Sequence, residues 1–241
     1  DVRPWDEDQK FSIVGKKQAR LDGYERVSGV AKFTHDIDLP GMLYGKFLRC
    51  PHPHARIKRL ATKKAEALGG VYAVFTHLNT PQIPWRSGQT YLFDPVLRYA
   101  GEEVACVIAE DEAVGMDALA LIEIEYEPLP FVIDPIDAMR AGAPEVQAGG
   151  NLLMGKPEIY ARGDIDQGLS EADAVVEGEF QTQTALHNCM ETHGSVALWE
   201  GETLTLWDST QHIHGVRDQV AQALGLAQNQ VRVIKQYMGG G

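Results

Sequence analysis

Two short segments near the end of the sequence contain residue types that could bind an anion or an oxo group. In the first, "DSTQHIHG" at 208–215, Ser209 and Thr210 are typical helix N-cap residues, which places Gln211 in or near a first helical turn. Free backbone N–H groups and the positive helix dipole meet there, and a primary amide can donate to an oxyanion or a metal-bound oxo group. The second segment is the glycine run at 239–241, whose backbone can approach a ligand closely because it has no Cβ. Each signal is weak alone, and their joint occurrence in one unit favours a binding site.

Hydrophobic periodicity predicts the elements around these two segments. Leu204 and Leu206 share one face of a predicted strand at 202–210, and a second strand is predicted at 230–238. Between them, 214–226 has the apolar spacing of an amphipathic helix, with a stripe formed by Val216, Val220 and Leu224. The order strand, helix, strand, glycine loop would bring the two anion-friendly loops to the same end of a sheet.

The earlier part of the sequence predicts a compact α/β or α+β domain. Strands are predicted at 42–50 and 69–76, and the continuous apolar run at 103–111 is typical of a strand buried on both faces. Asp111 is a predicted N-cap for a helix at 113–121, and an alternating strand follows at 122–126.

The predicted domain organisation follows from a change in composition. Residues 138–163 are rich in Gly, Pro and Ala without a period, so we predict a linker there. We therefore expect an arm at 1–19, a first domain at 20–137 and a second at 164–241. In the second domain Asp164 should cap a short helix, with further strands at 174–183 and 194–201.

Composition excludes several classes of protein. The 241 residues carry a formal net charge of −12, which argues against nucleic-acid binding, and 44% of them are hydrophobic, as in a soluble globular protein. No apolar run has the length of about 20 residues that a membrane span needs, and the acidic N-terminus lacks a signal-peptide core. The three cysteines form no C-x-x-C pair, so no metal ligand set is expected and a cytoplasmic location is favoured.

Four separated segments carry a common pattern. Residues 20–57 match D-G-x-x-K-V-x-G at Asp22, Gly23, Val27 and Gly29; the other segments are "VLRYAGEEVACVIAED" from residue 96, "HNCMETHG" from 187 and "DSTQ…MGGG" from 208. Together they resemble the large molybdenum subunit of the xanthine dehydrogenase/aldehyde oxidase family. The sequence departs from the family pattern at Arg26, Phe33 and Cys50, where the family has lysine, tyrosine and serine.

The resemblance implies an α+β fold, with an a/b hammerhead domain followed by the start of an α/β molybdopterin-binding domain. It implies a molybdenum–molybdopterin cofactor, usually the cytosine dinucleotide in bacteria, and oxidation of an aldehyde or N-heterocycle with water as oxygen source. Electrons would pass to 2Fe-2S and FAD groups on partner subunits. The family's oxo-binding glutamine falls on Gln211, and its glycine loop falls on Gly239, Gly240 and Gly241.

The family's glutamate base lies beyond Gly241, so no catalytic residue is expected in this chain. The remainder of the large subunit, or a second chain, would complete the site. Glu191 is interpreted as structural or as lining the substrate funnel, and His212 as a solvated helix end or a funnel residue. Two alternatives stay open: a reductive member of the hydroxybenzoyl-CoA reductase type, and a non-catalytic hammerhead fragment that mediates subunit contact. Export with a signal-bearing partner is the alternative to the cytoplasm.

Overall fold

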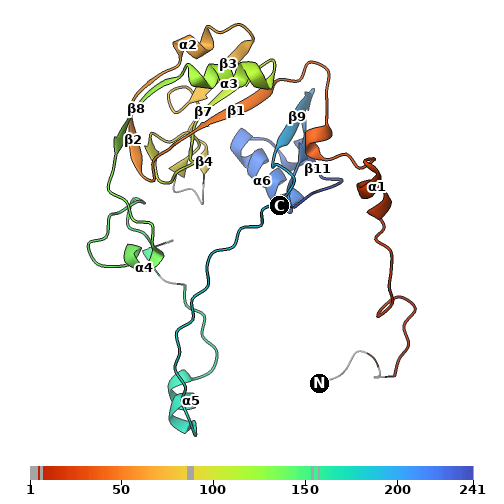
Figure 1. Ribbon diagram of the computed structural model, residues 1–241, viewed down its shortest axis with the longest axis vertical. Helices are drawn as coiled ribbons and strands as arrows, with labels where there is room; N and C mark the ends of the chain where they lie inside the picture. The colour runs from red at the N-terminus through yellow and green to blue at the C-terminus, as the bar shows by residue number, and fades with distance from the viewer. Residues whose placement is uncertain (1–4, 6–7, 86–89, 153–154, 157, 241) are drawn as a thin grey trace. The chain divides into compact units, whose positions relative to one another are not determined.

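The computed structural model describes residues 5, 8–85, 90–152, 155–156 and 158–240 (Figure 1). The chain divides into two compact units, which are described separately: a central unit of residues 39–183, and a composite unit of residues 1–38 and 184–241. Residues 20–38, predicted to open the first domain, group with the C-terminal residues in this division. The predicted limits at 19, 137 and 163 stay predictions.

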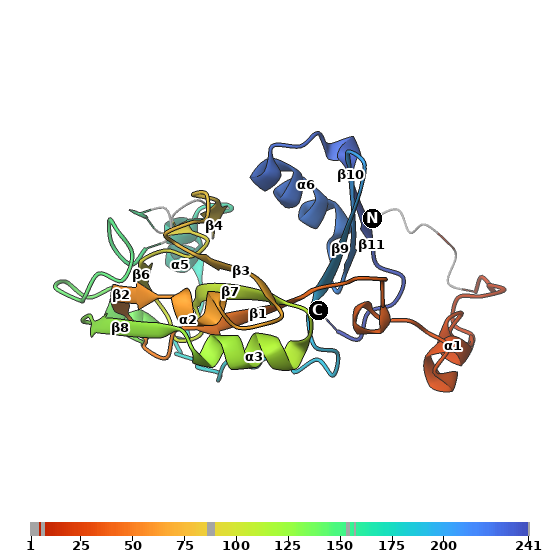
Figure 2. The ribbon, with the colours of Figure 1, turned by 90° about the horizontal axis from the view of Figure 1, so that it is seen from above.

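The central unit is built on a three-stranded antiparallel sheet in the order β1-β7-β3. Its strands are β1 (Tyr44–Arg49), β7 (Glu103–Ala109) and β3 (Val71–Thr76), close to the three predicted ranges. The middle strand β7 is buried along most of its length, which confirms the inference drawn from its continuous apolar run. Helix α3 (Glu112–Ala120) lies along β1 and β7, as Figure 2 shows.

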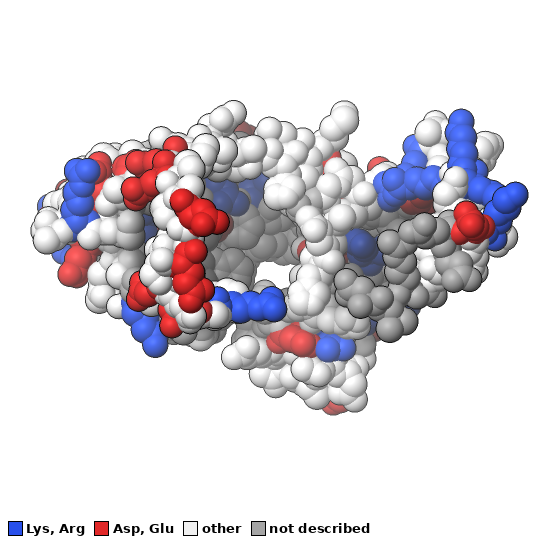
Figure 3. All heavy atoms as spheres, turned by 90° about the horizontal axis from the view of Figure 1, so that it is seen from below, with Lys and Arg blue, Asp and Glu red and all other residues white. Residues whose placement is uncertain are grey.

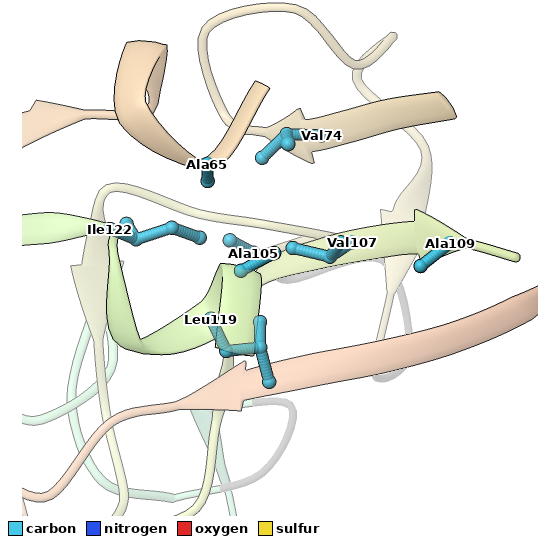
Figure 4. Close-up of a cluster of buried hydrophobic side chains, with 8 residues drawn as sticks. Ala65, Val74, Ala105, Val107, Ala109, Leu119 and Ile122 are labelled. Carbon is cyan, nitrogen blue, oxygen red and sulfur yellow. The ribbon is translucent and has the colours of Figure 1, made fainter. Parts of the chain in front are cut away.

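The core of this unit lies between the sheet and its helices. Buried residues of β7 meet side chains of β3, α3 and the short helix α2 (Lys63–Glu66), as Figure 4 shows. The cluster consists of Ala65, Val74, Ala105, Val107, Ala109, Ala118, Leu119 and Ile122. Four of the eight are alanines, so helix and sheet can approach each other closely.

A second sheet of the central unit has the order β6-β2-β8. It comprises β6 (Val96–Leu97), β2 (Ala55–Ala61) and β8 (Glu123–Pro128), and β8 corresponds to the strand predicted at 122–126. Strand β2 was not predicted, although its alternation of buried Ala55 and Ile57 with exposed Arg56 and Lys58 has the strand period. The remaining elements are β4 (Pro84–Trp85), β5 (Thr90–Tyr91), α4 (Pro135–Ala138) and α5 (Ile165–Glu171).

Both predicted aspartate caps are confirmed. The carboxylate of Asp111 accepts a hydrogen bond from the Val114 N–H at 2.8 Å, and that of Asp164 accepts from the Gln167 N–H at 2.9 Å. Each bond satisfies an N–H group that has no partner within its helix.

An Asp111→Ala substitution should therefore lower the free energy of unfolding by about 1 kcal/mol, because the first turn of α3 loses its side-chain acceptor. Urea unfolding of the purified protein measures this loss. Asp117→Ala, an exposed position within the same helix, is the matched control and should cost less. Equal losses in the two variants would contradict the capping role.

The strand predicted at 174–183 was wrong. The structure has no helix or strand at 174–183, and the side chains of Val176 and Phe180 are 96% and 95% exposed. A strand is stabilised by hydrogen bonds to a neighbouring strand, and none of the described residues pairs with this segment. The residues at 174–183 were therefore interpreted as a strand although no neighbouring strand within the described chain pairs with them.

A partly buried histidine makes the stability of the central unit depend on pH. The Nδ1 atom of His77, which follows β3, is buried without a hydrogen-bond partner among the described residues. Burial lowers the pKa of His77 below its usual 6.5, opposed by the nearby charge of Asp94. As pH falls below about 6.5 the unfolded chain takes up a proton before the folded chain does, so stability is lost.

A His77→Gln variant should lack the loss of stability that protonation of His77 causes at low pH. Between pH 7.5 and pH 5 the wild-type free energy of unfolding should fall further than that of the variant, as measured by urea unfolding at both pH values. His193→Gln removes an exposed histidine and serves as the control. Parallel losses in wild type and His77→Gln would refute the assignment.

The composite unit contains a three-stranded sheet in the order β11-β10-β9. Strand β10 (Thr203–Asp208) pairs antiparallel with β9 (Ser195–Glu200) and parallel with β11 (Val231–Ile234). Helix α6 (Ile213–Leu224) connects β10 to β11 and lies along the sheet (Figure 2). The predicted order strand, helix, strand is confirmed, although β11 ends four residues before the predicted limit at 238.

The core of the composite unit lies between α6 and this sheet. Leu204, Leu206, Ala221 and Val231 are buried together, with Val216, Val220, Leu226 and Val233 partly buried against them. Leu224, predicted on the same stripe, is 50% exposed, because α6 ends there at Gly225 (φ 66°) and Leu226 packs inward instead. The Leu226 N–H donates to the Ala221 carbonyl at 2.8 Å, the bond that closes a Schellman turn.

The surface carries charges of both signs. On the face shown in Figure 3, acidic and basic side chains are interspersed. In the described part of the chain, no helix combines the length and the apolar character needed to cross a membrane.

Candidate functional site

The glycine loop begins where β11 ends. The chain continues from Ile234 through Tyr237 and Met238 to Gly239 and Gly240, both partly buried. Gly241, the third predicted glycine of the site, lies outside the described residues. Because β10 and β11 are parallel, their carboxyl ends lie at the same end of the sheet. The loop after β11 and the segment with Gln211 after β10 therefore leave the sheet at that end.

Both described glycines of the loop lie against the segment Cys189–Glu191. A Cβ at Gly239 would lie 2.8 Å from the Cβ of Glu191, and a Cβ at Gly240 would lie closer than 3.0 Å to Sγ and Cβ of Cys189. Gly240 also has φ +126°, a conformation that residues with a side chain rarely adopt. Contact with this neighbouring segment therefore requires glycine at both positions.

One backbone donor of the loop is already used within the chain. The Gly239 N–H donates to Oε2 of Glu191 at 2.6 Å. An anionic or oxo ligand of the kind predicted for the glycine run would therefore compete with Glu191 for the N–H of Gly239. The Cβ-free face of Gly239 is also packed against Glu191.

Glu191 lies at an open hollow of about 340 Å³ within the composite unit. Its second carboxylate oxygen, Oε1, is buried and has no hydrogen-bond partner among the described residues. An unpartnered buried oxygen is costly, which marks the position as one prepared for a donor. The hollow is lined by Phe33, His35, Met190, Glu191, Thr192 and Gly239.

Gln211 lies two residues before the first residue of α6 and is exposed. The N-cap residue is His212, not Ser209 or Thr210 as predicted. Ser209 is buried and ties the end of β10 to Gly194, whose N–H donates to the serine Oγ at 3.0 Å. Thr210 Oγ1 accepts from the His212 N–H at 3.0 Å, so both hydroxyls shape the loop and neither caps the helix.

His212 covers the start of α6 with its ring. A Cβ at Gly215 would lie 2.6 Å from Nδ1 of His212, so the ring rests on the backbone of the first helical turn. The N-cap residue makes no side-chain capping bond. The structure thus places Gln211 and His212 together at the N-terminus of α6, and Glu191 with Gly239 and Gly240 at the loop after β11.

Sequence reasoning missed one residue at this site, Arg26. Nη1 of Arg26 donates to the carbonyl oxygen of Met238 at 3.2 Å, directly before the first loop glycine. The available signal was the departure from the family's lysine at this position. In the described part of the chain, no group of three His, Cys, Asp or Glu side chains could hold a metal ion.

Comparison with known families decides the classification of this arrangement. Residues 28–130 match the model for the aldehyde oxidase and xanthine dehydrogenase a/b hammerhead domain, and residues 148–241 match the model for the molybdopterin cofactor-binding domain. The chain belongs to the xanthine dehydrogenase/aldehyde oxidase family. The predicted order of a hammerhead domain followed by a molybdopterin-binding domain is thereby confirmed.

Individual proteins with similar sequences and structures support this family assignment. The xanthine dehydrogenase molybdenum-binding subunit of Escherichia coli O157:H7 is 35% identical in an alignment of 237 residues that covers 92% of this chain and 31% of that protein. The carbon monoxide dehydrogenase large chain of Afipia carboxidovorans is 34% identical, over 97% of this chain and 32% of its own length. Quinoline 2-oxidoreductase from Pseudomonas putida 86 superposes with a TM-score of 0.78 at 29% identity, covering 94% of this chain and 30% of its own. The chain thus spans under a third of each of these relatives.

Proposed function

We propose that this chain is part of the molybdenum-cofactor subunit of a hydroxylase or dehydrogenase that oxidises an aldehyde or N-heterocycle with water as the oxygen source. The observation that carries the proposal is the position of the glycine loop with Gly239 and Gly240, which leaves the sheet at the same end as the segment with Gln211. It lies within the segment that matches the molybdopterin cofactor-binding family. Glycine at these two positions lets the loop pack tightly on Cys189–Glu191, which fixes the position of the loop at the end of the sheet where Gln211 also lies.

Each residue has a distinct role in this proposal. Gln211, at the start of α6, donates its amide N–H to an oxo group of the cofactor, and Gly239, Gly240 and Gly241 form the surface against which the cofactor lies. Glu191 and His212 line the approach of the substrate. When bound, the molybdenum–molybdopterin group, as the cytosine dinucleotide, supplies oxygen transfer and accepts two electrons.

Further groups complete the enzyme. We propose that the base comes from the remainder of the large subunit or from a second chain, since no residue of this chain is assigned a catalytic role. Electrons would leave through 2Fe-2S and FAD subunits in the cytoplasm. Names of relatives such as nicotinate dehydrogenase large molybdopterin subunit, from Eubacterium barkeri, support a multi-subunit arrangement.

The molybdenum content per copy of this chain in the natively purified assembly, determined by elemental mass spectrometry, tests the proposal. A value near one supports it. A value near zero, with the protein cooperatively folded, would refute the cofactor role and favour the alternative of a non-catalytic hammerhead module. Product analysis with aldehydes, N-heterocycles and an aromatic acyl-CoA then separates oxidation from the reductive alternative.

A Gln211→Ala substitution should lower kcat or molybdenum content. One preorganised donor to a developing charge contributes about 1–3 kcal/mol, which corresponds to a loss of roughly 5- to 150-fold. Steady-state kinetics and elemental analysis measure the two quantities. Gln219→Ala, an exposed position on α6, is the matched control. A Gln211→Ala enzyme with normal turnover and normal metal content would remove Gln211 from the site.

A further inference from the structure

The peptide bond that opens the glycine loop is held at both of its polar atoms. Its carbonyl oxygen, on Met238, accepts from Nη1 of Arg26 at 3.2 Å. Its N–H, on Gly239, donates to Oε2 of Glu191 at 2.6 Å. The two atoms belong to one peptide plane, so a guanidinium and a carboxylate together fix the direction in which this plane faces.

Arg26 is itself held in place by three further contacts. Its Nε donates to Oδ2 of Asp22 at 2.6 Å, and its guanidinium carbon lies 5.6 Å and 5.5 Å from the ring centroids of Phe33 and Tyr237. The Arg26 side chain is only 24% exposed. A planar guanidinium can stack on rings and donate in its own plane at the same time, which the ammonium group of lysine cannot do.

The path of the N-terminal segment brings these partners together. Arg26 lies on the short helix α1 (Gly23–Ser28), which ends at Gly29 with φ +77°. After this turn the chain leads to Phe33, whose ring lies 6.0 Å from that of Tyr237. Tyr237 directly precedes Met238, so the stacking partner and the hydrogen-bond acceptor of Arg26 are consecutive residues.

A glycine loop needs such an external constraint. Glycine accepts positive and negative φ about equally, so a peptide next to Gly239 can flip at little steric cost. Hydrogen bonds with an ionised partner are roughly twice as strong as neutral ones, and here one acts on each end of the peptide dipole. A flip would turn the carbonyl toward Glu191 and the N–H toward Arg26, which is unfavourable at both ends.

We propose that Arg26 and Glu191 are positioning residues that lock the Met238–Gly239 peptide and so set the approach of the glycine loop to the cofactor. The consequence for the cofactor rests on the proposed function, whereas the lock itself rests on the contacts above. Glu191 fills this role through Oε2, which leaves Oε1 for another donor at the hollow. The departure from the family's lysine gives this chain a stacked guanidinium at the lock.

The test uses the full holoenzyme with Arg26→Met and Glu191→Ala. Hydrogen-exchange mass spectrometry of peptides covering residues 235–240 should show exchange at least ~10-fold faster in both variants. The Mo(V) electron paramagnetic resonance signal should broaden or shift, because the loop no longer holds one position. Glu191→Gln, which keeps an oxygen acceptor for the Gly239 N–H, should exchange nearly as slowly as wild type.

Arg20→Met is the charge-matched control. Arg20 also pairs with Asp22, but its side chain is 66% exposed and no contact joins it to Met238. It should leave exchange at 235–240 unchanged. Equal exchange in wild type and Arg26→Met, or equal acceleration in Arg20→Met and Arg26→Met, would overturn the lock. A wild-type assembly without molybdenum would instead overturn the proposed function, and the exchange comparison would still decide the lock.

Discussion

A Gly240→Ala substitution is expected to remove most of the molybdenum from the purified assembly, at least ~10-fold relative to wild type. At φ +126° an alanine is strained, by about 1–3 kcal/mol for such a conformation. Its Cβ would also overlap Sγ and Cβ of Cys189, so the loop must move away from the segment on which it rests. Elemental analysis and thermal unfolding of the same preparation measure occupancy and folding separately.

Two further variants separate the strain from the overlap. Gly225→Ala places alanine at φ +66° in open space after α6, so it should cost about 1 kcal/mol of stability and leave the molybdenum content unchanged. Cys189→Gly in the Gly240→Ala background removes the overlapping atoms and should restore part of the occupancy. Full occupancy in Gly240→Ala alone would show that the loop does not need its position against Cys189.

A Leu97→Ala substitution should lower the free energy of unfolding of the central unit by about 2–5 kcal/mol, the usual cost of emptying a fully buried leucine site. Leu97 has no exposed surface and packs in a cluster with Cys50, Ala55, Ile57 and Val104. Four neighbours on three different segments cannot all collapse into the space, so a cavity remains. Urea unfolding gives the magnitude.

The control for this prediction is Leu78→Ala, since Leu78 is 69% exposed. It should change stability by less than about 0.5 kcal/mol. A loss of under about 1 kcal/mol in Leu97→Ala would mean that the cluster closes around the alanine and that this second core contributes little. Both leucines are in the central unit, so the same unfolding transition reports both variants.

The sequence predicted those helices, strands and caps whose residue pattern lies within the element itself. The apolar run of β7 and the Asp111 and Asp164 caps depend on residues close in sequence, and each was found where it was expected. The stripe of α6 was found at Val216 and Val220 but not at Leu224, where the helix ends. The placement of Gln211 and the glycine loop at one end of the sheet followed from the strand–helix–strand order, because neighbouring parallel strands have their carboxyl ends at the same end of the sheet.

Features that depend on distant partners were not predictable in this way. The segment 174–183 was predicted as a strand from its own residues, but a strand also needs a neighbour to pair with, and none of the described residues provides one. Similarly, nothing around Arg26 indicates that Met238 is its acceptor, and nothing around Gly239 indicates that Glu191 takes its N–H. Such contacts are visible only once the fold has brought the segments together.

The contact between Arg26 and Met238 joins residues that are 212 positions apart. At synthesis rates of about 5–20 residues per second, Arg26 leaves the ribosome roughly 10–40 s before its partner. The whole central unit, residues 39–183, is made in that interval and can fold while the N-terminal segment waits. The Met238–Gly239 peptide therefore gains its contact with Arg26 only after the whole central unit has been synthesised.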